Sequence, residues 1–311
     1  MKKNLIRVPV LLGPTASGKT DIAIKLALEF GWEILSCDSR QIYRFMDIGT
    51  AKPTTDQLRA VKHWLVDIIE PSERYSAFRF AEDSLKIIRD LAGNSKTVLV
   101  CGGTGMYFRS LSEGLGVQVD SDPGLRDELM ERGRKEGSAA LHAELMEKDP
   151  ETALKLHPND LQRIVRALIV FYQSGEKISG MRERRAPEGV EFITAKLVVD
   201  REMLYDRINR RVEEMVGKGL YNEFLRLREC GYGQNSPGLQ CVGYKELFGV
   251  ERGEYSLDDA VEQIKRNTRR YAKRQITWFT HQTDAIEIPA DDAFTSLRKF
   301  YRAKMFLDCC D

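Results

Sequence analysis

The sequence predicts an α/β fold, in which helices flank a parallel β-sheet and an all-helical domain is inserted. Two observations support this prediction. Short apolar runs alternate with segments of helical spacing over roughly the first 115 residues, which is typical of a parallel sheet covered by helices. After this region the sequence becomes rich in charge and helical in pattern as far as residue 175.

The expected elements of the sheet follow one another along the chain. We expect five strands, at 8–12, 33–37, 64–69, 97–101 and 192–199. Helical segments are expected at 21–30, 77–91, 201–229 and 257–280. In a parallel sheet of this kind, ligands bind at the carboxyl ends of the strands. Three of these strand ends carry suggestive groups: a glycine-rich loop, Asp38-Ser39 and Gly102-Gly103-Thr104.

We interpret the charged helical stretch as an insertion in the α/β core. It ends in a segment rich in Gly, Pro and Arg at 175–190, and the strand expected next resumes the sheet. We therefore predict a core formed by residues 1–115 and 191–311 and a helical insertion at 116–190. The last helix of the insertion is expected to begin after Pro158, with Asn159 as its cap, and to end at Gly175.

Composition argues against several classes of protein. The formal net charge is +1, so any nucleic-acid surface would have to be a local basic patch. The six cysteines form no C-x-x-C pair and lie far from the four histidines, which argues against zinc and fits a reducing cytoplasm. No apolar run approaches the roughly 20 residues of a membrane span. We expect a cytoplasmic protein with no membrane partner and a loose tail at Cys309-Cys310.

The glycine-rich loop is G-P-T-A-S-G-K-T, at 13–20, which matches the pattern G-x-x-x-x-G-K-[ST]. Its glycines let backbone N–H groups point at phosphate oxygens, and the following helix adds the positive end of its dipole. Lys19 supplies a charge, and the Thr20 hydroxyl can hold Mg²⁺. The loop predicts a P-loop NTPase-like sheet and carries a nucleotide- and ATP-binding signature, but it does not show whether the phosphate belongs to ATP. The residues expected to hold the phosphate are Gly13, Thr15, Ala16, Ser17, Gly18, Lys19 and Thr20.

The acidic group that a phosphoryl-transfer ATPase needs beside this loop is hard to find. No second acidic strand end of the usual kind follows, and we find no adenine-binding signature. The best candidate is Asp38, in S-C-D-S-R-Q-I-Y. Its carboxylate has three interpretations: a Mg²⁺ ligand, a catalytic base, or an aspartate that caps a turn at a strand end.

Three features indicate basic surfaces. Residues 265–274, K-R-N-T-R-R-Y-A-K-R, include six basic and no acidic residues, and on a helix these six span about half the circumference. Such a face suits a phosphodiester backbone better than an ordinary solvated face, which mixes both signs. A second cluster comprises Arg182, Arg184 and Arg185. On the helix after Pro158, Gln162 and Arg166 lie along one edge, whereas Arg163 is expected to be solvated without a partner.

One arginine is placed unusually. The apolar stripe of the helix after residue 200 comprises Leu204, Ile208, Val212 and Met215, and Arg211 falls inside this stripe. A buried arginine needs an anionic partner. The partner is either a structural carboxylate or a phosphate group of a ligand, and the nearby phosphate loop favours the ligand.

Together these motifs are similar to those of the bacterial tRNA dimethylallyltransferases, in the family's order from residue 13 to about 280. They are G-P-T-A-S-G-K-T, S-C-D-S-R-Q-I-Y-R-F-M-D-I-G-T-A-K-P, G-G-T-G-M-Y, D-P-E-T-A-L-K-L-H-P-N-D-L-Q-R-I-V-R-A-L, Q-C-V-G-Y-K-E-L and R-R-Y-A-K-R-Q-I-T-W-F. The resemblance is specific because the second motif is not a general phosphate-loop pattern.

The resemblance implies that the loop holds the diphosphate of dimethylallyl diphosphate rather than ATP. The five-carbon group would pass to the exocyclic amine of the adenosine just 3′ of the anticodon of tRNA. Asp38 would be the general base. Lys19, Arg211, Thr104 and Mg²⁺ would stabilise the leaving diphosphate, with Thr20 on the metal.

The resemblance also implies contacts with the tRNA anticodon stem-loop. The segment after the second strand would contact the flipped adenosine, the insertion would close over the stem, and the basic helix would hold phosphates. We also expect a monomer. The residues expected to contact tRNA are Asp38, Ser39, Arg40, Gln41, Arg126, Gln162, Arg163, Ile164, Val165, Arg166, Gln240, Cys241, Val242, Gly243, Tyr244 and Lys245.

The sequence departs from the family at two positions. Three other functions are also compatible with parts of the sequence. His63-Trp64 stands where relatives often have two histidines, and Ile169 stands where many have an acid. A small-metabolite kinase explains the phosphate loop but not the basic helix. A nucleic-acid-binding NTPase would need a second acidic motif. A prenyltransferase acting on free AMP or ADP would not need the surfaces at 160–185.

Overall fold

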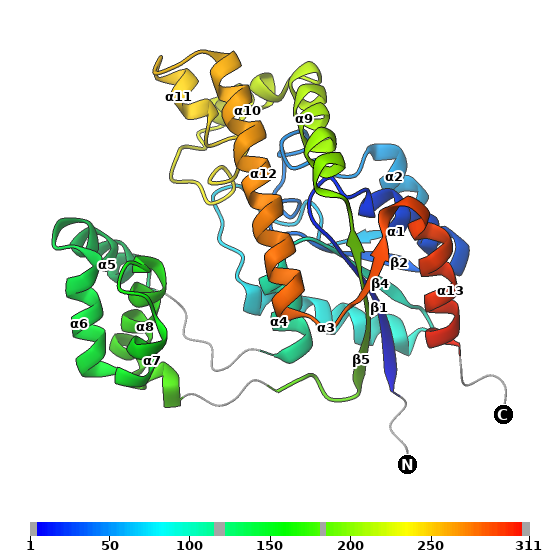
Figure 1. The fold of residues 1–311 in the computed structure, drawn as a ribbon, viewed down its shortest axis with the longest axis horizontal. Helices are drawn as coiled ribbons and strands as arrows, with labels where there is room; N and C mark the ends of the chain where they lie inside the picture. The colour runs from blue at the N-terminus through cyan, green and yellow to red at the C-terminus, as the bar shows by residue number, and fades with distance from the viewer. Residues whose placement is uncertain (1–4, 115–121, 181–184, 307–311) are drawn as a thin grey trace. The chain divides into compact units, whose positions relative to one another are not determined.

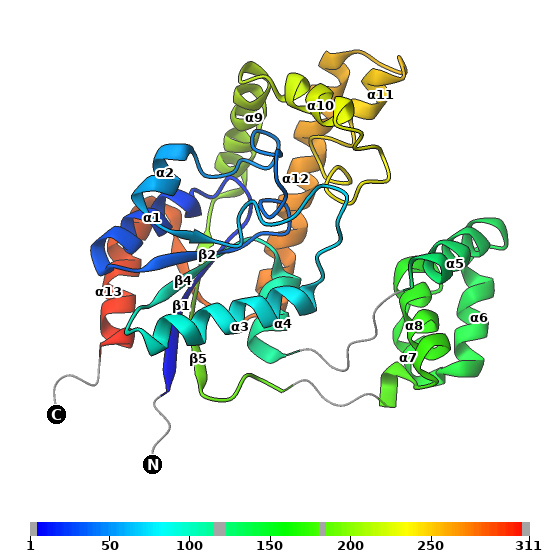
Figure 2. The same ribbon diagram turned by 180° about the vertical axis from the view of Figure 1, so that it is seen from behind.

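The computed structural model describes residues 5–114, 122–180 and 185–306 of the 311-residue chain. It forms two compact units (Figures 1 and 2). The first, here called the α/β core, comprises Met1–Ser112 and Pro187–Asp311, and the second, the helical unit, comprises Glu113–Ala186. Within the described ranges, no helix has both the length and the apolar character that crossing a bilayer requires.

A single parallel sheet forms the centre of the α/β core. Its six strands lie in the order β3-β2-β4-β1-β5-β6, and every described pair is parallel. The carboxyl ends of the central strands therefore meet at one edge. The strands are β1 (Ile6–Leu12), β2 (Glu33–Cys37), β3 (His63–Trp64), β4 (Val98–Gly102), β5 (Val190–Val198) and β6 (Ile286–Pro289).

Alternation along β1 divides the core into two layers. Val10 and Leu12 pack into the larger apolar cluster, whereas Leu11 packs into the other, because successive side chains of a strand point to opposite faces. The second cluster includes residues of α1 and α13, which contact each other. The helices of the core are α1 (Lys19–Phe30), α2 (Thr55–Ala60), α3 (Ala77–Gly93), α4 (Gly105–Glu113), α9 (Arg201–Gly217), α10 (Leu220–Glu229), α11 (Leu247–Glu251), α12 (Leu257–Gln282) and α13 (Ala293–Met305).

The helical unit has an apolar core of its own. Leu141, Leu145, Ile164 and Leu168 are fully buried within it. The buried carboxylate of Asp149 caps α7 and accepts four hydrogen bonds, from the backbone N–H and hydroxyl groups of Thr152 and Ser179. The helices of this unit are α5 (Pro123–Lys135), α6 (Ser138–Lys148), α7 (Pro150–Lys155) and α8 (Leu161–Ser174), followed by the short η1 (Ile178–Gly180).

Several sequence predictions need correction. The strand expected at 64–69 is limited to His63–Trp64, because Leu65 and Asp67 take positive φ angles of 60° and 56°, which turn the chain out of the sheet. The helical segment at 201–229 is two helices, separated at Gly219, which has a φ of 92°. The cap of α8 is Asp160, whose side chain accepts from the N–H of Arg163, and not Asn159.

Candidate active site

The phosphate loop turns tightly between β1 and α1, at the carboxyl edge of the sheet. Gly18 has a φ of 85° and Ala16 a φ of 61°, so two of its residues take the left-handed conformation. A side chain on Gly13 would come within 3.1 Å of the Ser17 hydroxyl and 3.3 Å of Leu197. This curled backbone aims the N-terminus of α1 at the space above the loop, where an anion is stabilised.

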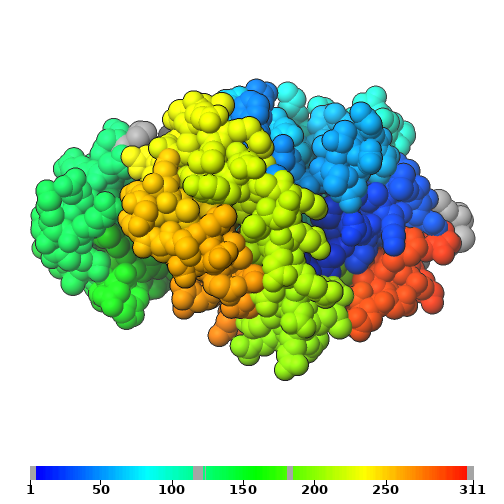
Figure 3. All heavy atoms as spheres, turned by 90° about the horizontal axis from the view of Figure 1, so that it is seen from above, coloured from blue at the N-terminus to red at the C-terminus, as the bar shows by residue number. Residues whose placement is uncertain are grey.

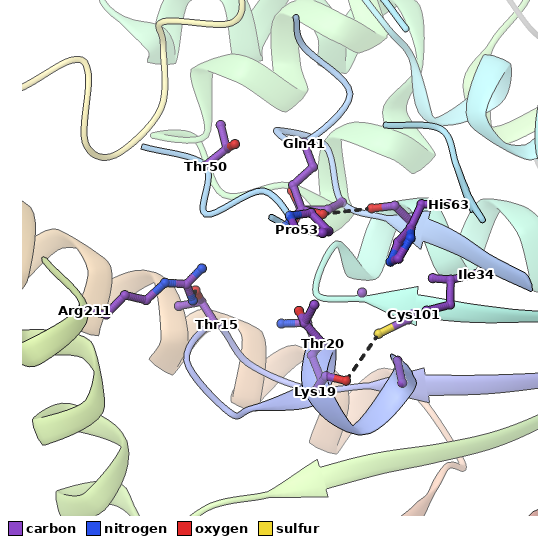
Figure 4. Close-up of a pocket in the computed structure, with 14 residues that line it drawn as sticks. Thr15, Lys19, Thr20, Ile34, Gln41, Thr50, Pro53, His63, Cys101 and Arg211 are labelled. Carbon is purple, nitrogen blue, oxygen red and sulfur yellow. Dashed lines mark hydrogen bonds between the residues drawn. The ribbon is translucent and has the colours of Figure 1, made fainter. Parts of the chain in front are cut away.

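Lys19 and Thr20 form the first turn of α1 (Figure 4). The Lys19 ammonium donates to the carbonyl of Pro14 at 3.2 Å. Burial lowers the pKa of Lys19, and the nearby Arg211 charge acts in the same direction, whereas the Asp38 carboxylate raises it. Both residues line a cavity of about 60 Å³ together with Asp38, Gln41, His63 and other groups. An added anion would offset the repulsion between Lys19 and Arg211.

Arg211 reaches the phosphate loop from α9. Its Nη1 donates to the Thr15 hydroxyl at 3.3 Å, and burial lowers the pKa of this guanidinium. Among the described residues, no carboxylate lies within ion-pair distance of Arg211. The structure therefore lacks the structural carboxylate that was one of its two expected partners. The neighbouring Arg207 donates to the carbonyl of Ser17 at 3.5 Å.

Asp38 follows β2 and faces the same space. Its Oδ1 accepts from the N–H of Arg40 at 2.8 Å, so this aspartate does cap a turn. The carboxylate also lines both cavities of the site, so the turn does not exclude a chemical role. Thr104, after β4, lies beside it: the Thr104 hydroxyl accepts from the N–H of Ser39 at 3.0 Å.

A second cavity, of about 280 Å³, adjoins the first. The two share Thr15, Lys19, Asp38, Thr50 and Arg211, so a ligand on the loop would border both. One part of the second wall is apolar, and it includes Ile208, Val212, Met215 and Ile264. The polar part includes Ser39, Arg40, Gln240, Cys241, Gly243, Lys245, Tyr271, Arg274 and Gln275, and Val242 adds a further apolar side chain. In Figure 3 the segments coloured yellow-green to orange, which contribute these walls, lie beside the blue segments that carry the loop.

Gln275 of α12 is a site residue that the sequence prediction missed. Its Oε1 accepts from the N–H of Thr15 at 2.8 Å, and its Nε2 donates to the carbonyl of Gly103 at 2.8 Å. It thus joins the phosphate loop to the end of β4. A Cβ on Gly103 would lie 2.4 Å from this amide, which explains the glycine. The sequence did contain one indication of this role, because Gln275 is a polar amide on the half of the basic helix that carries no charge.

Glu223 of α10 is the second residue that was missed. Its buried carboxylate accepts from the N–H groups of Asp47, Ile48 and Gly49 at 2.8–3.0 Å and from the Tyr244 hydroxyl at 2.5 Å. This one side chain holds together two segments that border the second cavity. No local pattern indicates it, because its partners lie 21 to 176 residues away.

The chain is similar to known proteins over most of its length. The sequence model of the IPP transferase family matches residues 41–282, and that of isopentenyl transferase matches residues 6–72. A tRNA dimethylallyltransferase of Acetivibrio thermocellus is 43% identical over 304 residues, which cover 95% of this chain and 97% of that protein. The chain belongs to the tRNA dimethylallyltransferase family. The resemblance inferred from the motifs is thereby confirmed.

Solved structures of the family show the same fold. The tRNA isopentenylpyrophosphate transferase of Bacillus halodurans aligns with a TM-score of 0.72 at 34% identity, covering 96% of this chain and 97% of that one. A eukaryotic dimethylallyltransferase acting on tRNA aligns with a TM-score of 0.78 at 26% identity, covering 97% of this chain and 79% of that one. The predicted α/β fold with a helical insertion is confirmed.

Three of the residues that this transferase is expected to use for tRNA binding have buried side chains. Ile164 and Val165 are 0% and 2% exposed inside the helical unit, and Tyr244 is fully buried against Glu223. Each of these three side chains is part of a packed core, so a contact of these residues with tRNA would be made by the backbone. That they contact tRNA stays a prediction. Gln162 and Arg166 are exposed as expected.

The structure agrees with some of the predictions made for the arginines of the helical unit and corrects others. Arg163 is exposed as predicted, but it does have a partner, because its Nε lies 3.4 Å from Asp160, the cap of its own helix. Arg126 is half-buried, and Arg185 is exposed. Arg182 and Arg184 lie outside the described residues, as does the Cys309-Cys310 tail.

The basic face of α12 in the transferase is partly neutralised by α9. Lys265 contacts the carboxylates of Glu213 and Glu262 at 2.9 and 2.8 Å, and Arg269 donates to Asn209. In the described part of the chain, the exposed Arg266, Arg270 and Lys273 form no ion pair. These three cations, together with Arg274 at the second cavity, are charges of this helix that are available to an anionic ligand.

Proposed function

We propose that this family member transfers a dimethylallyl group from dimethylallyl diphosphate to the exocyclic amine of the adenosine 3′-adjacent to the anticodon in tRNA. The observation that carries the proposal is the position of Asp38. Its carboxylate borders both the cavity of the phosphate loop and the larger cavity lined by Ser39, Arg40 and Tyr271. A base at this junction can serve a reaction between an anchored diphosphate and a nucleoside.

The reaction is a displacement at an allylic carbon. The adenosine nitrogen forms a bond to the first carbon of the dimethylallyl group, and the bond from that carbon to the diphosphate oxygen breaks. The diphosphate leaves with the electron pair, and Asp38 takes the proton from the amine. Lys19, Arg211 and the loop N–H groups stabilise the charge that develops on the leaving group, and their burial strengthens this effect. We propose that Thr104 aids this charge stabilisation, from its position beside Ser39.

The residues of the first cavity fit Mg²⁺. The Thr20 hydroxyl and the Asp38 carboxylate line one cavity, and both are hard oxygen donors. Among the described residues, no group of three or more His, Cys, Asp or Glu side chains could hold a metal alone. This suits Mg²⁺, which typically combines one or two protein ligands with phosphate oxygens and waters. When bound, the ion would neutralise charge on the diphosphate. We propose Thr20 as its protein ligand.

The tRNA would be held by charge and by the second cavity. We propose that Arg266, Arg270 and Lys273 contact backbone phosphates and that the helical unit closes on the anticodon stem. The flipped adenosine would occupy the second cavity, which Ser39 and Arg40 line, and Gln41 lines the adjoining first cavity. Gln240, Cys241, Val242, Gly243 and Lys245 border the same space. We further propose a monomeric enzyme of the cytoplasm.

The test is transfer of radiolabelled dimethylallyl diphosphate to a synthetic anticodon stem-loop in the presence of Mg²⁺. We expect label in the RNA with the wild type, and its near-complete loss in Asp38→Ala while the variant still binds RNA. Absence of label with the wild type, together with consumption of ATP, would instead indicate the kinase.

A further inference from the structure

His63 presents an unused hydrogen-bond acceptor beside the phosphate loop. Its Nδ1 lies 2.8 Å from the carbonyl of Val61. A carbonyl only accepts, so Nδ1 must carry the hydrogen, and Nε2 of the neutral ring is then a bare acceptor. Burial lowers the pKa of His63, which favours this neutral form near pH 7.

The ring is held in place by its strand. His63 pairs with Ile34 of β2, and the indole of the next residue, Trp64, donates to Glu33 at 2.7 Å. Nε2 is shielded from solvent, and no described residue hydrogen-bonds to it. A buried acceptor without a donor destabilises the folded state, so a native structure that keeps one calls for an explanation.

The position of His63 restricts the kind of donor that could reach Nε2. The imidazole lines the 60 Å³ cavity with Lys19, Thr20 and Asp38. Figure 4 labels His63, Lys19 and Thr20 among the residues around this cavity. An ionised diphosphate has only acceptors on its oxygens, and so has the Asp38 carboxylate. The amide of Gln41 already donates to the carbonyl of Ala51 at 3.1 Å. The Lys19 ammonium and the Thr20 hydroxyl also line this cavity, but neither donates to Nε2 in the structure. A water molecule that the ligand carries into the cavity is a further donor.

We propose that His63 is a positioning residue, whose Nε2 accepts a hydrogen bond from a water on the magnesium ion of the bound diphosphate. This inference rests on the proposed function, because it takes magnesium diphosphate as the ligand of the loop. Mg²⁺ keeps several waters when it binds through phosphates. A neutral acceptor orients such a water without competing for the phosphate charge. His63 thereby makes the site prefer the hydrated magnesium complex to diphosphate alone.

Two substitutions separate the two ring nitrogens. His63→Asn keeps a donor near the position of Nδ1, for Val61, and removes the acceptor. His63→Gln places an amide oxygen near the position of Nε2 and removes the donor to Val61. The readout is isothermal titration of inorganic diphosphate, with and without Mg²⁺, and thermal unfolding serves as the control for folding.

We expect His63→Asn to weaken binding of diphosphate about 10- to 100-fold when Mg²⁺ is present, the range typical of groups that orient a metal's ligands. Binding without Mg²⁺ should be unchanged, and His63→Gln should recover most of the loss. A second readout uses protein whose histidines carry ¹⁵N, with diphosphate bound and Mn²⁺ in place of Mg²⁺. Pulsed EPR of the wild type should show a weak outer-sphere coupling between Mn²⁺ and ¹⁵N, and His63→Asn should lack this coupling.

Three outcomes would overturn the proposal. An equal loss with and without Mg²⁺ would mean that His63 acts on the loop itself. A larger loss in His63→Gln than in His63→Asn would mean that the contact with Val61 is what matters. Unchanged binding in both variants would leave His63 without a role. Failure of the proposed function is a separate result: wild-type protein would bind magnesium diphosphate yet transfer no label to RNA.

Discussion

Gln275 donates a hydrogen bond to the carbonyl of Gly103 across a sequence separation of 172 residues. The same side chain accepts from the N–H of Thr15 in the phosphate loop. One amide therefore sets the distance between the loop and the strand end that leads to Thr104. The hydrogen bond to Gly103 is buried and the one from Thr15 is partly buried, so the loss of this side chain leaves two polar backbone groups without their partner.

We predict that Gln275→Leu loosens the phosphate loop. The two backbone groups lose their partner, which should lower the free energy of unfolding by about 2 kcal/mol or more. The affinity for magnesium diphosphate should fall at least about tenfold, because the loop is no longer preorganised. Chemical denaturation and isothermal titration measure the two effects. Gln282→Leu, at the exposed end of the same helix, is the control, and an equal effect there would refute the assignment.

Asp38→Asn tests the base with little disturbance of the turn. Its amide oxygen can still accept from the N–H of Arg40, whereas it cannot take a proton from the adenosine amine. We expect kcat to fall by about 10²- to 10⁴-fold, with little change in stability or in RNA affinity. Single-turnover transfer to an anticodon stem-loop measures the step, and an unchanged rate would remove Asp38 from the chemistry.

Gly49→Ala should disrupt the segment that follows Asp38. A Cβ at this position would lie 2.4–2.7 Å from the ring and hydroxyl of Tyr244, which is itself fixed by Glu223. Overpacking of this kind costs about 1–3 kcal/mol. Gly93→Ala is the matched control, because it meets no atom within 4 Å in α3 and should stabilise the helix by about 0.5–1 kcal/mol. Equal midpoints in urea for the two variants would contradict the packing argument.

The cations of α12 should differ in their contribution to RNA binding. We consider the slope of the logarithm of the stem-loop binding constant against the logarithm of the salt concentration. Replacing Arg266, Arg270 and Lys273 together by Gln should make this slope shallower by roughly two, because each cation is expected to contact one phosphate. Lys265→Gln should change the slope less, since this lysine already pairs with Glu213 and Glu262. Fluorescence anisotropy over a series of salt concentrations provides the comparison. A larger change in Lys265→Gln would reverse the assignment.

The parts of the site that follow from sequence are those made by neighbours in the chain. The phosphate loop, the turn after Asp38 and the capped start of α12 each depend on residues a few positions apart. Local geometry still chose between adjacent candidates: Asp160 and not Asn159 caps α8. The apolar run at 64–69 was misassigned because positive φ angles at Leu65 and Asp67 leave no signature in hydrophobicity.

The sequence by itself determined the α/β class, the phosphate loop, the candidate base and the family, because each depends on residue patterns that are contiguous or strictly spaced. Only the tertiary structure decided that Gln275 and Glu223 hold the site together, that Tyr244 is buried, and that α9 neutralises Lys265. These outcomes depend on which side chains meet across long stretches of chain. Such meetings are set by packing and by the need to pair every buried polar group, and no single segment encodes them.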